Sequence, residues 1–132
     1  MMIAPASGTE GDNMKVIGII GSRRRKSKSD YKQLEDKFLS IYEEGDEIVS
    51  GGCPKGADAM GEHLAKKHQV TIKIYYAKWN YLGKRAGFAR NTYIARDADE
   101  IIAMVAEDRT GGTEDTVKKF LKNNDEDKLY LI

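Results

Sequence analysis

The chain has few residues of the kinds that cross-link or rigidify a small protein. Its 132 residues include one cysteine, two prolines and one tryptophan. Cys53 alone excludes an internal disulfide, and no Cys/His spacing typical of structural zinc is present. A chain of this length can bury a sufficient core without cross-links. We therefore expect a protein of a reducing, cytoplasmic compartment with no metal site.

A strong net charge is also missing. Lysine and arginine total 22 against 21 acidic residues, which gives a formal charge of +1. No overall field then attracts DNA, RNA or an anionic membrane, so any anion recognition has to be local. Residues 1–13 lack the basic start and apolar run of a signal peptide or membrane span. We expect a disordered tail there, followed by a single domain over residues 14–132.

Short apolar runs alternate with helical patterns along the rest of the chain. The runs predict strands at residues 16–20, 47–50, 70–75, 100–105 and 129–132. The first helix is predicted to begin at an N-cap, Asp30, with Gln33 three residues later, and to end at Gly45. Strands and helices in alternation predict an α/β fold, a doubly wound three-layer sandwich with a mainly parallel sheet of about five strands.

Glycine clusters follow three of the predicted strands. They are Gly21-Ser22, then Gly51-Gly52 through Gly56, then Gly111-Gly112-Thr113. In an open parallel sheet, ligands bind outside the carboxyl ends of the strands. Glycines let backbone N–H groups approach an oxyanion, and the N-terminus of a helix favours negative charge. Turn geometry explains any one loop equally well, but three loops together predict a phosphate-binding site.

Two common nucleotide-binding motifs are absent. The first strand leads through Gly18-Ile19-Ile20-Gly21-Ser22-Arg23, which is not the dinucleotide pattern G-x-G-x-x-G. No glycine loop ends in the Gly-Lys-Ser/Thr of a Walker A motif. These absences weaken the interpretations as an ordinary NAD dehydrogenase or NTPase.

Four other motifs occur in a fixed order. They are Gly21-Ser22-Arg23, Ser50-Gly51-Gly52-x-x-x-Gly56-Ala57-Asp58, Trp79-x-x-x-Gly83-Lys84-x-Ala86-Gly87-x-x-Arg90-Asn91 and Gly111-Gly112-Thr113. Over residues 15–122 this set resembles the YspA-type branch of the SLOG superfamily, a Rossmann-like group that includes the LOG phosphoribohydrolases and the DprA domain. The resemblance implies recognition of a nucleotide or nucleotide-derived ligand, with N-glycosidic hydrolysis in LOG members. It also favours a homodimer.

Arg23 is the first candidate for a phosphate clamp. It follows the first strand directly, and its planar guanidinium can bind two phosphate oxygens at once. The basic run continues through Arg24, Arg25, Lys26 and Lys28. A run of charge is usually a solvated loop, so we expect these four side chains to face water.

The remaining candidates have two interpretations each. Asp58 either accepts hydrogen bonds from ribose hydroxyls or braces its own loop. Trp79 either stacks on a base or packs against the protein. Lys84 lies near a predicted helix start, where a cation is useful for binding an anion. Arg90 and Asn91 are consecutive on a helix and diverge by about 100°, so the resemblance is the reason for including them.

The resemblance to LOG enzymes breaks down at one position. Their motif Pro-Gly-Gly-x-Gly-Thr-x-x-Glu has a catalytic glutamate, but the third residue after Thr113 is Thr116. Glu114 is the candidate replacement, although Glu114 and Asp115 are also explained as first-turn carboxylates that favour the helix dipole. Cys53 has no base near it in sequence, and we expect it to fill the loop.

Three functions are left open by the sequence. The favoured one is a nucleotide-binding module for a nucleoside phosphate or an ADP-ribose-like signal. The first alternative is a nucleoside 5′-monophosphate phosphoribohydrolase that uses Glu114. The second is single-stranded nucleic-acid binding as in DprA, and the balanced charge of the chain argues against it. The base and the number of phosphates are not specified by these motifs.

Overall fold

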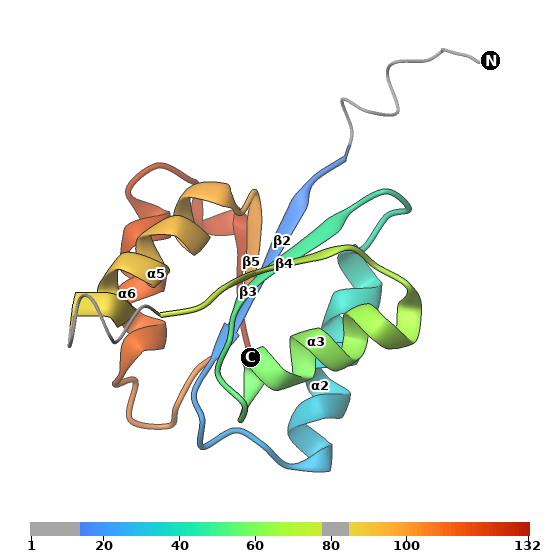
Figure 1. Ribbon diagram of the computed structural model, residues 1–132, viewed down its shortest axis with the longest axis horizontal. Coiled ribbons are helices and arrows are strands. Elements are labelled where there is room, and N and C mark those ends of the chain that lie inside the picture. Colours follow the sequence, from blue (N-terminus) through green and yellow to red (C-terminus); the bar gives the residue numbers. More distant parts are fainter. Residues whose placement is uncertain (1–13, 78–84) are drawn as a thin grey trace.

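The apolar run Val16–Gly21 forms the central strand, β2, of a five-stranded sheet with the order β4-β3-β2-β5-β6 (Figure 1). The computed structural model describes residues 14–77 and 85–132. All four strand pairs are parallel. The predicted α/β, Rossmann-like fold is confirmed. The predicted tail over residues 1–13, together with Trp79 and Lys84, lies outside the described residues.

The other elements follow the predicted alternation with small changes at their ends. The strands are β3 (Glu47–Gly51), β4 (Ile72–Tyr75), β5 (Glu100–Met104) and β6 (Leu129–Leu131). The helices are α2 (Lys28–Ile41), α3 (Ala57–His68), α5 (Arg85–Asp97), α6 (Gly112–Leu121) and the short 3-10 turn η1 (Glu126–Lys128). In the part of the chain that the structure describes, no helix has the length and apolar character to cross a membrane.

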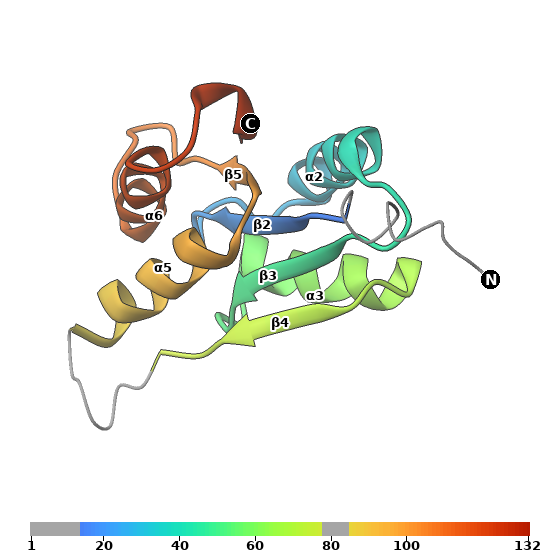
Figure 2. The ribbon, with the colours of Figure 1, turned by 90° about the horizontal axis from the view of Figure 1, so that it is seen from above.

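Two helical layers cover the two faces of the sheet (Figure 2). Alternate side chains of β2 serve the two layers, because successive residues of a strand point to opposite faces. Ile17 and Ile19 pack with α2 and α3, whereas Ile20 packs with α5 and α6. Since the connection through α5 carries the chain across to β5, the strand order reverses between β2 and β5. Rossmann-like proteins bind their ligands at such a reversal.

The first helix begins three residues earlier than predicted. Ser27, not Asp30, is the N-cap: its Oγ accepts a hydrogen bond from the Asp30 N–H at 3.0 Å. Asp30 Oδ2 accepts in return from the Ser27 N–H at 3.2 Å, which completes a capping box. The predicted end was also wrong, since the helix ends at Ile41 and Gly45 lies in the following turn with φ of 98°.

Candidate functional site

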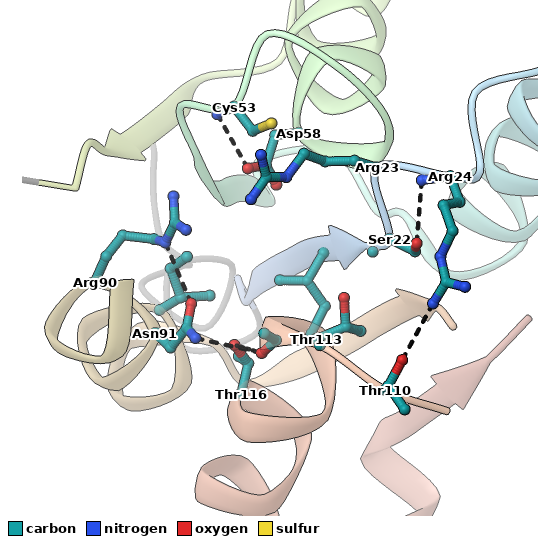
Figure 3. A pocket seen from close by; sticks show the side chains of 15 residues that line it. Ser22, Arg23, Arg24, Cys53, Asp58, Arg90, Asn91, Thr110, Thr113 and Thr116 are labelled. Atoms are coloured by element: carbon teal, nitrogen blue, oxygen red, sulfur yellow. Dashed lines mark hydrogen bonds between the residues drawn. The ribbon is translucent and has the colours of Figure 1, made fainter. Parts of the chain in front are cut away.

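The three glycine loops meet at the carboxyl ends of β2, β3 and β5, where they enclose a cavity of about 350 Å³ (Figure 3). Helix α5 supplies the remaining wall. The lining residues are Ile20, Gly21, Ser22, Arg23, Arg24, Cys53, Asp58, Arg90, Asn91, Ile94, Thr110, Gly111, Gly112, Thr113 and Thr116. Nine of the predicted ligand-binding residues are therefore brought to one place from four segments of the chain.

Two of the glycines are the N-caps of the helices that point at this cavity. Gly56 precedes α3 with φ of 72°, and Gly111 precedes α6 with φ of 101°. Neither helix has a side-chain cap, so N–H groups of both first turns stay available to an anion. A β-carbon on Gly56 would lie 2.7 Å from the Ser22 carbonyl oxygen and 2.9 Å from the Arg23 Cα. The first two loops are thus packed directly against each other.

Gly51 and Gly52 do not line the cavity, but their lack of a side chain leaves room for neighbouring side chains. A β-carbon on Gly51 would lie 2.7 Å from both Arg90 Nη1 and Asp58 Oδ2. A β-carbon on Gly52 would overlap the ring of Tyr76. The role of these two glycines is therefore to admit neighbouring side chains.

Arg23 is exposed at the mouth of the cavity, and it has no hydrogen bond or ion pair within residues 14–77 and 85–132. The side chain of Arg24 faces water, as expected, but it also has protein partners. It lines the cavity and its two Nη atoms donate to Asp108 at 3.2 and 2.8 Å. Nη2 also donates to Thr110 Oγ1 at 3.2 Å. Arg24 thus ties the first glycine loop to the third, which the sequence could not show.

Arg25 is a structural residue, and the expectation that it faces water was wrong. Its Nη1 donates to the carbonyl oxygens of Val105 and Ile132 at 2.9 and 3.0 Å. Its Nε pairs with Asp30 Oδ1 at 2.7 Å, and its side chain is only 21% exposed. Arg25 therefore holds the loop after β2 to α2 and to the segments that follow β5 and β6.

Asp58 both lines the cavity and braces the second loop. Its Oδ2 accepts a hydrogen bond from the Cys53 N–H at 3.1 Å, and its Oδ1 lies 3.2 Å from Ser50 Oγ. Burial raises the pKa of Asp58, although the Cys53 N–H and the charge of Arg90 oppose that rise. The hydrogen bond from the Cys53 N–H shows that Asp58 braces its own loop.

Arg90 and Asn91 both line the cavity although they are consecutive on α5. Arg90 Nε donates to Asn91 Oδ1 at 3.2 Å. Asn91 is buried, and its Nδ2 donates to the Gly112 carbonyl oxygen at 3.3 Å and to Asp115 Oδ2 at 3.2 Å. Asn91 thus fixes the third glycine loop against α5, and it leaves the remaining nitrogens of Arg90 to the cavity.

Threonines, and not Glu114, line the cavity on the side of the third loop. Thr113 and Thr116 are buried and line the cavity (Figure 3). Glu114 is not among the lining residues. It forms a two-fold ion pair with Arg109, with Nε to Oε2 at 2.8 Å and Nη2 to Oε1 at 2.9 Å. The candidate catalytic residue is thus directed away from the site.

Six lining residues were not among the predicted ligand-binding residues: Ile20, Arg24, Cys53, Ile94, Thr110 and Thr116. Thr116 had a usable pattern, because it lies three residues after Thr113 and therefore on the same face of α6. Thr110 is brought in by its contact with Arg24, which depends on tertiary structure. Within residues 14–77 and 85–132, no three His, Cys, Asp or Glu side chains cluster as a metal site requires.

No protein family model, curated protein or solved structure matches this chain. The function of the cavity therefore has to be inferred from the residues that line it. These are two uncapped helix N-termini, three arginines, two buried threonines and one carboxyl group.

Proposed function

We propose that this chain binds a nucleotide or nucleotide-derived ligand, such as a nucleoside phosphate or an ADP-ribose-like molecule, in the cavity between the three glycine loops. The volume of about 350 Å³ falls in the range of about 300–1,000 Å³ usual for small-molecule pockets. The chain would then act as a sensor or a processing module for that ligand.

The observation that supports the proposal best is the concentration of anion-binding groups around one cavity. Arg23, Arg24 and Arg90 come from two separate segments, and the first turns of α3 and α6 lack side-chain caps. Guanidinium groups and helix N-termini are the groups that proteins use to bind phosphate. Their concentration stands out because the whole chain is almost neutral.

Binding without hydrolysis is the form of the proposal that the geometry favours. A general base has to reach the attacking water directly or through one further water. Glu114 is held by Arg109 and does not line the cavity. Single-stranded nucleic-acid binding is less well supported, because such sites use aromatic platforms and, within residues 14–77 and 85–132, the lining residues of this cavity are all non-aromatic.

Calorimetric titration with adenosine 5′-monophosphate (AMP), adenosine diphosphate, ADP-ribose and inorganic phosphate tests the proposal. We expect saturable binding of at least one of the nucleotides at one site per chain. A salt titration separates the alternatives, because polynucleotide binding weakens steeply as several counterions are released. Failure of all four probes to bind, together with salt-sensitive binding of a single-stranded oligonucleotide, would overturn the proposal.

A further inference from the structure

The cavity contains one carboxyl group among groups that attract anions. Asp58 lines the same wall as Arg90, and Arg23 lies at the mouth of the cavity. A phosphate placed against an ionised carboxylate is repelled, whereas a hydrogen-bond donor is attracted. The part of the ligand that contacts Asp58 therefore carries donors.

Asp58 has acceptor capacity that the protein does not use fully. An ionised carboxyl group has about four acceptor positions. The Cys53 N–H occupies one of them at 3.1 Å, and the Gly51 N–H also stabilises the carboxylate. Ser50 Oγ lies 3.2 Å from Asp58 Oδ1, but its single proton also has the Ile19 carbonyl oxygen as an acceptor at 2.6 Å. Because the shorter bond keeps the proton, Oδ1 receives little from Ser50.

Arg90 places unused donors next to this acceptor. Gly51 separates the two side chains, since a β-carbon there would lie 2.7 Å from both Arg90 Nη1 and Asp58 Oδ2. The Nε of Arg90 is taken by Asn91 Oδ1. In the part of the chain that the structure describes, the Nη atoms of Arg90 have no protein acceptor within hydrogen-bond distance.

An acceptor beside a donor matches hydroxyl groups better than other ligand groups. A hydroxyl donates one hydrogen bond and accepts others, whereas a phosphate only accepts and an amino group mainly donates. We propose that Asp58 and Arg90 recognise the ribose hydroxyls of the ligand, so that the site selects ribonucleotides over deoxyribonucleotides. This inference rests on the proposed function, and it assigns one wall of the same cavity to the sugar.

Matched ligands and matched variants test this assignment by calorimetry. The ligands are AMP, its 2′-deoxy and 3′-deoxy analogues, and inorganic phosphate. The proteins are the parent, Asp58→Asn, and the control Asp127→Asn, which changes an exposed carboxylate on η1. We expect the parent and the control to bind AMP about 10-fold more tightly than at least one deoxy analogue. In Asp58→Asn that ratio should fall to about 2-fold or less, whereas phosphate binding should not weaken, because the substitution removes a repelling charge.

The outcomes separate the two proposals. Equal affinity of the parent for AMP and both deoxy analogues would overturn the ribose assignment and leave nucleotide binding standing. Failure of AMP, adenosine diphosphate, ADP-ribose and phosphate all to bind would count against the proposed function itself. If circular dichroism shows that Asp58→Asn does not fold, Arg90→Met provides the second variant, and its ribose preference is expected to fall in the same way. A preference that persists in a folded Arg90→Met would contradict the assignment.

Discussion

Both Nη atoms of Arg24 donate to the carboxylate of Asp108, across the gap between the loop after β2 and the loop after β5. The hydrogen bonds from Arg24 and Thr110 hold the pKa of Asp108 well below its usual range. The pair is exposed to solvent, and exposed ion pairs add little to stability. Its role is to connect the loop after β2 with the loop after β5, both of which line the cavity.

Arg23→Ala is expected to weaken AMP binding by about 1.5–3 kcal/mol, the scale of a hydrogen bond to a charged group. The reason is that Arg23 lines the cavity and has no partner within residues 14–77 and 85–132. Calorimetry measures the change, and Lys28→Ala is the control because Lys28 is exposed at the start of α2. Equal losses in the two variants would indicate a diffuse basic patch.

Arg25→Ala is expected to lower the free energy of unfolding by about 2 kcal/mol. The substitution leaves the carbonyl oxygens of Val105 and Ile132 and the carboxylate of Asp30 without their shared donor. Urea denaturation gives the change in midpoint, with Lys26→Ala as an exposed control. An unchanged midpoint for Arg25→Ala would mean that these hydrogen bonds contribute nothing net.

The fold was predictable because it depends on local pattern. Continuous apolar runs mark strands buried on both faces, and helical patterns between them leave few arrangements other than a parallel sheet. The meeting of the glycine loops then follows from strand direction alone. The start of α2 was harder, since Ser27 and Asp30 are both good capping residues and the structure uses them together.

The roles of the arginines were not predictable from the sequence. Arg23, Arg24 and Arg25 are adjacent and chemically identical, yet their roles differ. Arg23 lines the cavity, Arg24 pairs with Asp108, and Arg25 donates to the Val105 carbonyl oxygen. The partner of Arg24 and the two carbonyl oxygens that Arg25 binds lie about 80 or more positions further along the chain and are set by tertiary packing. The order of charged residues in the sequence does not show which of these groups become neighbours in the folded protein.

Stability is expected to fall in acid through Asp46, which is buried at the end of the sheet opposite the cavity. Burial alone would raise its pKa, but hydrogen bonds from Lys15 Nζ at 2.6 Å, the Lys15 N–H at 2.9 Å and the Glu43 N–H at 2.9 Å outweigh this and lower it. A lowered pKa in the folded state stabilises the protein above the unfolded value of 3.8, and this contribution is lost as the pH falls below it.

The measurement is the urea midpoint between about pH 2 and pH 7 for the parent, Asp46→Asn and the exposed control Asp36→Asn. The difference between the parent and Asp46→Asn should be on the order of 2 kcal/mol at neutral pH and should shrink in acid. A difference that is independent of pH would show that the charge of Asp46 is not what stabilises the fold.

Glu114→Gln is expected to leave nucleotide affinity unchanged, because Glu114 is paired with Arg109 and lies outside the cavity lining. We expect the parent to release AMP intact, as judged by chromatography of the incubated nucleotide. Glu107→Gln, an exposed carboxylate, is the control. Release of free adenine by the parent and the control, reduced about 10²-fold or more in Glu114→Gln, would establish hydrolysis and Glu114 as its base.

The close approach of Gly56 to Ser22 and Arg23 has a consequence for how this protein can be altered. A side chain at position 56 would displace the backbone of the first loop, and because its contacts are with backbone atoms, no substitution of Ser22 or Arg23 would make room for it. Variants selected for a new ligand would therefore have to keep Gly56 and vary other positions of the two loops. For protein engineering and for natural variation alike, the close contact between these two loops restricts position 56 to glycine.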